Sequence, residues 1–353
     1  MLVPDGVCGY TERVTTTRFI YISVAGLVAV FGFFSNILLI LFHTTPSKPP
    51  SHFPAFLALL DALLCFCFVV IFVVDVNMMY LELPGLFTFY HQYIVIAFST
   101  AKVVQLLIPY MLIMATFERY KWIVKRKSTV SAKARPLSAL ILVIVATGIR
   151  IPAAMALTVT HFPDCPDFFR TLAVDVLPWA KESTIYAAFD IYGMAFLQTF
   201  LPFITLFSLN FIIIRKLCMM SSKMRRSSFA MLPGVRPSIL SSLRRYKMPP
   251  TVRSAVYTMM AIVSTYLVCN SLHLVLTLLE VGNASILFEE FDSFQASTLY
   301  TTLGDTVSIL YMTSSAIRIL IYAMCNPAIL KQLSSNEFLE RFGRRKQSSD
   351  VIL

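Results

Sequence analysis

Residues 53–78 read FPAFLALLDALLCFCFVVIFVVDVNM, and this stretch decides the fold class. It is almost wholly apolar, and Asp61 lies in the middle of it, in the LALLDALL segment at 57–64. A helix rises about 1.5 Å per residue, so roughly 20 apolar residues cross the hydrocarbon core of a bilayer. We therefore expect this stretch to be a helix that crosses a membrane.

Six further stretches have the same length and character. Backbone groups in lipid must bond within the chain, which allows only helices or closed barrels. The stretches lack the two-residue alternation of barrel strands, so the sequence predicts an all-α membrane protein, a bundle of seven transmembrane helices. The expected spans are residues 19–42, 53–78, 91–124, 136–160, 184–219, 252–279 and 297–324.

The composition agrees with lipid as the solvent of this chain. It has 353 residues, of which 57% are hydrophobic and 14% charged, and its mean hydropathy is +0.72. Soluble domains are about 45–50% apolar. The formal net charge of +11 comes from basic residues between long apolar stretches, which indicates loops facing an anionic leaflet and argues against nucleic acid as a partner.

Basic residues in the loops predict the orientation. Of the 30 lysines and arginines, 22 lie in the loops after spans 1, 3 and 5 and in the tail, whereas the opposite side holds only Arg13, Arg18, Arg170 and Lys181. The positive-inside rule places the N-terminus outside and the C-terminus in the cytoplasm. We expect a multi-pass protein of the plasma membrane, and the first span is too long for the core of a cleavable signal peptide.

The expected organisation has three parts. Residues 1–18 form an extracellular N-terminus, and residues 19–324 form the seven-span domain, with a third cytoplasmic loop at about 220–251. Residues 325–353 form a cytoplasmic tail, in which 326–342 can make a short amphipathic helix on the membrane surface. Serines in the third loop and the tail are candidate kinase sites.

The extracellular side is rich in acids. They are either ordinary solvated loop residues or a vestibule that steers a cationic ligand, and the sequence leaves both readings open. Asn283 begins an Asn-Ala-Ser glycosylation sequon on this side. The acids are Asp5, Glu12, Glu82, Asp164, Asp167, Asp175, Glu182, Glu280, Glu289, Glu290 and Asp292.

A few polar residues and one proline lie inside the spans. Ionisable groups there are costly and usually functional. Asn36 lies in span 1, Asp61 in span 2 and Pro202 in span 5. Span 3 closes with FERYKW at 117–122, which contains Glu118, Arg119 and Tyr120, and span 7 ends SSAIRILIYAMCNP at 314–327, which contains Tyr322.

This combination resembles the rhodopsin-like G-protein-coupled receptors over about residues 19–342. LVCNSLHLVLTLLE at 267–280 and SSAIRILIY at 314–322 resemble, more narrowly, invertebrate FMRFamide-like neuropeptide receptors. The resemblance implies that Glu118 pairs with Arg119 at rest, that Arg119 is released on activation to contact a heterotrimeric G protein, and that Tyr322 rearranges toward it. Pro202 would permit a bulge that lets span 5 move, although many transmembrane prolines only kink a helix.

The chain departs from the family in span 7, where Arg318 and Ile319 replace the usual Asn and Pro. A buried arginine needs a partner, so we expect Arg318 to neutralise Asp61 in a polar core that also includes Asn36 and Ser314, and to take the place of the sodium ion that many relatives hold. The alternative is that Arg318 extends to the cytoplasmic interface.

Two further departures concern span 6 and the disulfide. Asn270 stands where the family carries a tryptophan before a kinking proline, and is either a switch residue or an interhelical hydrogen-bonding group. The family disulfide joins the top of span 3 to the second extracellular loop, but that helix top has no cysteine. We expect Cys165 to pair instead with Cys8, the other cysteine expected outside.

Two residue types that are absent from spans 7 and 3 narrow the class of ligand. Span 7 has no lysine for a retinal Schiff base, and the stretch STAKVVQLL at 99–107 offers no Asp for a biogenic amine. Lys102 either forms an ion pair with Asp305 or Glu280 or meets a ligand carboxylate, and Gln105 is expected to line the same face one turn below. We expect a peptide that bears arginine, with guanidinium contacts from Glu280, Glu289, Glu290 and Asp292.

Other classes of protein fit less well. No nucleophile–base pair, phosphate loop, metal-ligand spacing or cofactor motif is apparent, which argues against an enzyme. A transporter or channel would show internal repeats or interrupted helices, and we find neither in the sequence. A chemosensory receptor for small molecules remains an alternative with the same fold. Arrestin and receptor kinases are further partners that the resemblance implies.

Overall fold

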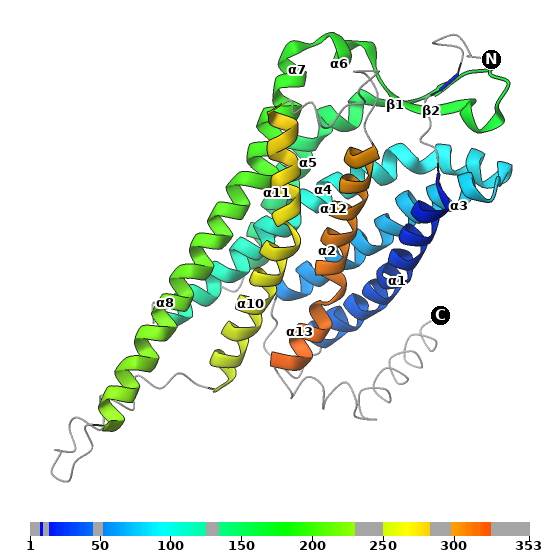
Figure 1. Ribbon diagram of the computed structural model, residues 1–353. Helices are drawn as coiled ribbons and strands as arrows, with labels where there is room; N and C mark the ends of the chain where they lie inside the picture. Colours follow the sequence, from blue (N-terminus) through cyan, green and yellow to red (C-terminus); the bar gives the residue numbers. More distant parts are fainter. Residues whose placement is uncertain are drawn as a thin grey trace, which may run out of the picture.

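The computed structural model describes residues 8–9, 14–44, 52–124, 134–229, 250–282 and 298–325, and it forms a bundle of long helices capped at one end by a small hairpin (Figure 1). In this part of the chain, seven helical segments are long and apolar enough to cross a membrane. We refer to them as spans 1 to 7. The protein is thus a multi-pass membrane protein by the length and composition of its helices.

The first four spans are mostly continuous. Span 1 is α1 (Thr16–Thr44), and span 2 is α2 (His52–Phe68), the π-helical turn η1 (Val69–Val73) and α3 (Val74–Tyr80). Span 3 is α4 (Pro84–Ile123), and span 4 is α5 (Ala134–Ala156).

Span 5 contains two π-helical turns, and spans 6 and 7 each contain one irregular residue, Asn270 and Ile317. Span 5 runs through α7 (Thr184–Ala188), the π-helical turns η3 (Phe189–Gly193) and η4 (Ala195–Phe200), and α8 (Leu201–Phe229). Span 6 is α10 (Pro250–Cys269) followed by α11 (Ser271–Val281), and span 7 is α12 (Thr298–Ala316) followed by α13 (Arg318–Cys325).

The outer faces of the helices are apolar, as lipid requires. Leu27, Ile96, Ile144 and Val268 are each more than 60% exposed in the isolated chain. Soluble proteins rarely expose so many large apolar side chains around the whole circumference of a helical bundle. The inner core lies where spans 2, 3, 5 and 6 meet, around fully buried side chains such as Ile108 and Leu206.

The expected span limits agree with the structure to within three residues at all but two ends. Span 3 begins at Pro84 and not at residue 91, because Pro84 needs no hydrogen-bond acceptor at a helix start and Phe87 and Tyr90 are buried in the first turns. The preceding turn is tight: Glu82 has a φ of 50°, in the left-handed region.

Span 4 ends at Ala156 and not at residue 160, because the chain turns into a strand that the sequence analysis did not predict. Strands β1 (Leu157–His161) and β2 (Leu172–Val176) form an antiparallel hairpin, with Leu157 opposite Val176 and His161 opposite Leu172. The alternating Thr and Val of β1 suit a strand. A 3₁₀ turn, η2 (Phe168–Arg170), joins the strands, and α6 (Pro178–Glu182) leads into span 5.

Candidate functional site

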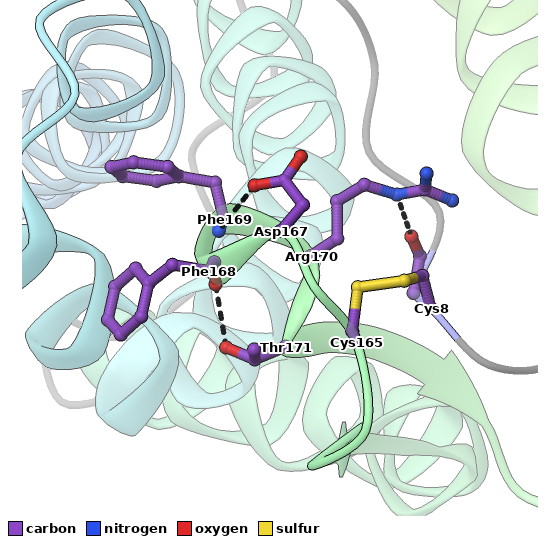
Figure 2. The surroundings of a disulfide bond; sticks show 8 residues. Cys8, Cys165, Asp167, Phe168, Phe169, Arg170 and Thr171 are labelled. Atoms are coloured by element: carbon purple, nitrogen blue, oxygen red, sulfur yellow. Dashed lines mark hydrogen bonds between the residues drawn. A yellow bond between two sulfur atoms is a disulfide. The ribbon is translucent and has the colours of Figure 1, made fainter. Parts of the chain in front are cut away.

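The hairpin end of the bundle is tied to the N-terminal segment by a disulfide bond, as Figure 2 shows. Cys8 and Cys165 are bridged, with their Cα atoms 5.0 Å apart, so the expected pairing is confirmed. Gly9 donates its N–H to the Arg170 carbonyl at 3.0 Å, and Arg170 Nε donates to the Gly9 carbonyl at 2.9 Å. Two hydrogen bonds therefore hold the segment beside the covalent link.

The hairpin itself carries one exposed ion pair. Lys181 Nζ lies 2.8 Å from Asp175 Oδ1 and donates to Oδ2 at 2.9 Å. This hydrogen bond from Lys181 is the main reason that the pKa of Asp175 lies below its usual value. The pair joins β2 to α6 and so fixes the approach of the chain to span 5.

Asp305 belongs to a different contact from the one expected. It pairs with Arg18 at the start of α1, whose Nε lies 2.8 Å from Asp305 Oδ2. The expected alternative of a Lys102–Asp305 pair is therefore wrong. The Arg18 side chain can reach span 7 because α1 starts three residues earlier than predicted, at Thr16, beside the Tyr80 hydroxyl.

A cavity of about 620 Å³ lies at the hairpin end among spans 3 to 7. The base of the hairpin, Leu157 and Val176, forms part of its wall. Its polar and charged lining residues are Lys102, Arg150, Tyr186, Asp190, Gln198, Thr199, His273, Thr277, Glu280 and Tyr300.

Two predicted ligand residues line this cavity, and two of those that the structure describes, Gln105 and Asp305, do not. Lys102 and Glu280 face it together, but no carboxylate among the described residues lies within 4.0 Å of Lys102 Nζ, which sits 4.9 Å from the centre of the Phe98 ring. Gln105 is not among the lining residues, which corrects the expectation for it. Its backbone carbonyl instead accepts a hydrogen bond from Tyr311 at 2.8 Å. Glu289, Glu290, Asp292 and Asn283 lie outside the described residues.

Eight polar lining residues were missed in the sequence, among them Arg150, Asp190, Gln198 and His273. Arg150 and Asp190 lie within spans 4 and 5, so the rule that singled out Asp61 applies to them equally. Gln198 and His273 could be found only from the structure, because a single polar residue on a helix face does not tell which neighbour it meets.

Below the cavity, three spans meet at a buried pair of tyrosines. The Tyr266 and Tyr311 rings are in edge contact, with centroids 5.9 Å apart. Tyr311 also donates to the Gln105 carbonyl, so spans 3, 6 and 7 are linked at this level. Both tyrosines are at least 95% buried.

Farther from the hairpin end than the two tyrosines, Asp61 and Arg318 form a buried ion pair. Arg318 Nη1 donates to Asp61 Oδ2, and the two side chains are 2% and 0% exposed. The Ser315 hydroxyl stands beside the carboxylate without meeting strict hydrogen-bond geometry. The expected direct pairing is therefore present, and Arg318 does not extend to the interface.

Asn36 and Ser314 complete this polar core. Asn36 is fully buried and donates to the carbonyls of Gly32 at 2.8 Å and Ser315 at 3.1 Å, which joins span 1 to span 7. Ser314 donates to the Tyr311 carbonyl within span 7. Both are hydrogen-bonding groups of the packed interior.

Spans 6 and 7 are each broken next to this polar core. Asn270 separates α10 from α11, with φ −97° and ψ 4°, and its side-chain amide donates to the Tyr266 carbonyl at 2.9 Å. Ile317 separates α12 from α13, directly before Arg318. The sequence analysis found no interrupted helices and so missed these two irregular positions. In span 6 the irregular residue is an asparagine and not a proline, and the Tyr266 carbonyl accepts both its backbone N–H, at 2.9 Å, and its side-chain amide.

Pro202 follows a widened turn in span 5. The Leu201 N–H bonds the Phe196 carbonyl five residues back, as a π-helix requires. The next bond of this pattern would join an N–H of residue 202 to the Leu197 carbonyl, and it cannot form because proline has no backbone N–H. The Tyr110 hydroxyl of span 3 donates to the Leu197 carbonyl at 2.8 Å and satisfies that acceptor. The bulge that Pro202 was expected to permit is thus present.

The opposite end of the bundle holds Arg119 with Glu118 and Tyr120 in the last turns of α4. All three are half-buried. Tyr322 is buried in α13, within electrostatic range of both Arg119 and Arg318, and its ring packs edge-on against His43 at 5.4 Å. Ser254 of span 6 donates to the Cys325 carbonyl of span 7 at 2.7 Å. The resting pair of Glu118 with Arg119 stays a prediction.

Comparison with known proteins gives no family: no protein-family model and no curated protein matches this chain. The class that the fold defines is therefore a seven-span membrane protein with a charged cavity at its hairpin end.

Proposed function

We propose that this chain is a G-protein-coupled receptor of the rhodopsin-like class, located in the plasma membrane, which transmits ligand binding to a heterotrimeric G protein. The ligand is a peptide that bears arginine, similar to the RF-amide peptides. Arrestin and receptor kinases act on the same cytoplasmic face. The proposal follows from the resemblance of residues 19–342 to this class.

One structural observation supports the proposal most strongly. Buried groups stand at successive levels between the cavity and Arg119: the Tyr266–Tyr311 pair, then the Asp61–Arg318 pair, then Tyr322, which lies within electrostatic range of Arg318 and Arg119. The irregular residues of spans 6 and 7, Asn270 and Ile317, lie in the same helices. Helix breaks absorb large backbone rotations, so a ligand in the cavity could bias the position of the helix ends beside Arg119.

Carboxylate side chains at the cavity are the proposed contacts for the arginine of the ligand. Glu280 accepts a hydrogen bond from Tyr300 at 2.9 Å at the edge of the cavity, and Asp190 lines it from span 5. Carboxylates bind guanidinium in a two-point geometry, which gives both affinity and orientation. Glu289, Glu290 and Asp292 follow Glu280 in the chain and remain predicted contacts.

The experiment is a cell assay. The chain is expressed with a promiscuous G protein, and a library of amidated peptides is screened for calcium release. We expect a peptide response that Arg119→Ala abolishes and that Glu280→Lys weakens at least tenfold, with both variants present at the cell surface. A response that survives Arg119→Ala would contradict the proposed G-protein contact, and unchanged potency in Glu280→Lys would remove that residue from the ligand site.

A transporter is the second candidate, because two broken spans beside a buried ion pair are also typical of carriers. Reconstituted liposomes test it directly. Solute flux or ion current through the purified protein would favour this class over the receptor. A small-molecule response in the same calcium screen, without any peptide response, would instead favour a chemosensory receptor.

A further inference from the structure

The charged groups of the cavity are sorted by depth. Glu280 lies seven residues, or about 10 Å, nearer the hairpin end than His273 on the same helix. Asp190 lies eight residues nearer that end than Gln198 on span 5, and Arg150 lies six residues below Ala156, where span 4 meets the hairpin. Arg150 donates to Gln198, and Lys102 lies within electrostatic range of His273, so both cations lie at the deeper level. We call this level the floor of the cavity and the level of Glu280 and Asp190 its rim.

The two cations of the floor lack an acidic partner in direct contact. Arg150 is 92% buried and donates Nη2 to Gln198, while its Nε has no hydrogen-bond partner among the described residues. Lys102 and Arg150 lie within electrostatic range of one another. Asp190 acts on both of them and Glu280 acts on Lys102, in each case from beyond 4.0 Å. A buried donor without a partner is costly, so the floor is built to receive an acceptor.

The rim offers the opposite chemistry. Glu280 is held by the Tyr300 hydroxyl, and Asp190 is exposed toward the cavity side of span 5. An anion placed at the floor would meet Lys102, Arg150 and His273, whereas a cation there would meet two like charges. Like charges at close range repel one another, so an anion is the favoured occupant of the floor.

We propose that the cavity binds a dipolar ligand, with an anionic group between Lys102 and Arg150 and a cationic group about 10 Å away at Glu280. The inference deepens the proposed function and rests on it only in taking this cavity as the ligand site. A volume of about 620 Å³ suits a molecule of two or three residues in size. An amidated peptide has no terminal carboxylate, so such a ligand would supply the anion from an acidic side chain.

The test is direct binding to the purified full-length protein in lipid nanodiscs, with no G protein present. The probe is 6-guanidinohexanoate, which carries both charges on one chain. Its matched controls are 6-guanidinohexanamide, which lacks the anion, and hexanoate, which lacks the cation. We expect the dipolar probe to bind at least tenfold more tightly than either control.

Variants assign the two ends of the probe. Lys102→Met and Arg150→Met should each bring the affinity of the dipolar probe down to that of the amide, and Glu280→Gln should bring it down to that of hexanoate. Lys181→Met, an exposed lysine outside the cavity, should leave all three affinities unchanged. Should a variant fail to fold, the comparison of the three probes on the unmodified chain still decides.

Equal binding of the amide and the acid to the unmodified chain overturns the inference, as does the absence of binding by all three probes at millimolar concentration. Neither result bears on the calcium assay, so the proposed function can stand without it. Preference for the dipolar probe in a protein that never couples to a G protein supports the inference and contradicts the receptor.

The source of the anion follows from one more pair of probes, the dipeptide Arg-Phe with a free or an amidated carboxyl terminus. Tenfold tighter binding of the free form supports a peptide terminus at the floor. Equal binding of the two dipeptides, with the preference for guanidinohexanoate retained, supports a small acid in that place.

Discussion

The side chains of Asp61 and Arg318 illustrate how a membrane protein keeps charge in its interior. Each is almost fully buried, and each is the direct partner of the other. Removing two ions from water costs several kcal/mol each, and their attraction offsets this only when both are present. Losing one partner should therefore cost much more than losing both.

Arg318→Leu is expected to destabilise the protein by about 3–5 kcal/mol, because it leaves the Asp61 carboxylate buried alone. Asp61→Leu alone should also be destabilised, whereas the double variant Asp61→Leu with Arg318→Leu should lie close to the unmodified chain. Thermal unfolding of the four proteins in detergent measures the coupling as a double-mutant cycle. Additive effects would contradict a direct pair, and so would a large effect of sodium on ligand affinity that Asp61→Asn abolishes.

Site prediction from the sequence succeeded where a residue had one physically sensible partner. Arg318 could meet few groups other than Asp61, and Cys165 could meet only Cys8 among the cysteines expected outside. Site prediction failed for Asp305 and Gln105, because the group that each residue contacts depends on how far its helix is rotated about its axis. A helix that is apolar all round gives no signal for that rotation.

Among the helices, the close approach of spans 1, 2 and 7 depends on one small residue. A Cβ atom at Gly32 would lie 2.6 Å from the Ala316 Cβ and 2.7 Å from the Cys65 Sγ. Small residues let membrane helices approach closely and gain dispersion contacts where no hydrophobic driving force exists. The same approach brings Asn36 within reach of the Ser315 carbonyl.

Gly32→Ala is expected to cost about 1–3 kcal/mol, since the added methyl group overpacks this contact. Gly148→Ala is the matched control, because nothing lies within 4 Å of the Cβ position there. It should be neutral or stabilising by up to about 1 kcal/mol, as alanine favours a helix. Equal melting temperatures for the two variants would show that the spans are not packed as described.

The contact between the ends of spans 6 and 7 makes a second prediction for the helices. The Ser254 hydroxyl joins α10 to the last residue of α13, and separation of these helix ends must break that bond. In the proposed receptor, Ser254→Ala should raise basal nucleotide exchange on the G protein a few-fold, the size expected for one hydrogen bond. Exchange is measured with purified components and no ligand.

Ser99→Ala serves as the control, because within the described part of the chain that hydroxyl bonds only the Val95 carbonyl of its own helix. It should leave basal exchange unchanged. A Ser254→Ala protein with the basal rate of the unmodified chain would mean that this bond does not restrain span 6.

The apolar stretches predicted the helices well because length and hydropathy alone determine where a chain can cross lipid. They predicted neither the hairpin nor the helix breaks. The strands depend on pairing between Leu157–His161 and Leu172–Val176, which is not local in the sequence. The irregular turn at Asn270 has no proline to mark it, and an asparagine in an apolar stretch does not by itself indicate one.

For the molecule as a whole, the disulfide closes a loop of 157 residues that contains the first four spans. Replacing Cys8 and Cys165 by serine should lower stability, by less than about 5 kcal/mol, because helices already inserted in a membrane leave the open chain less freedom than in water. Differential scanning in detergent, with and without reductant, measures the loss. Mass spectrometry that finds both thiols free in the purified protein would contradict the bond.

The disulfide can form only after a large part of the chain has been synthesised. Ribosomes add about 5–20 residues per second, so roughly 8–30 seconds separate the synthesis of Cys8 from that of Cys165. In the proposed orientation, four helices must have crossed the membrane before the two thiols can meet. A chain that stops earlier keeps the Cys8 thiol unoxidised by this partner.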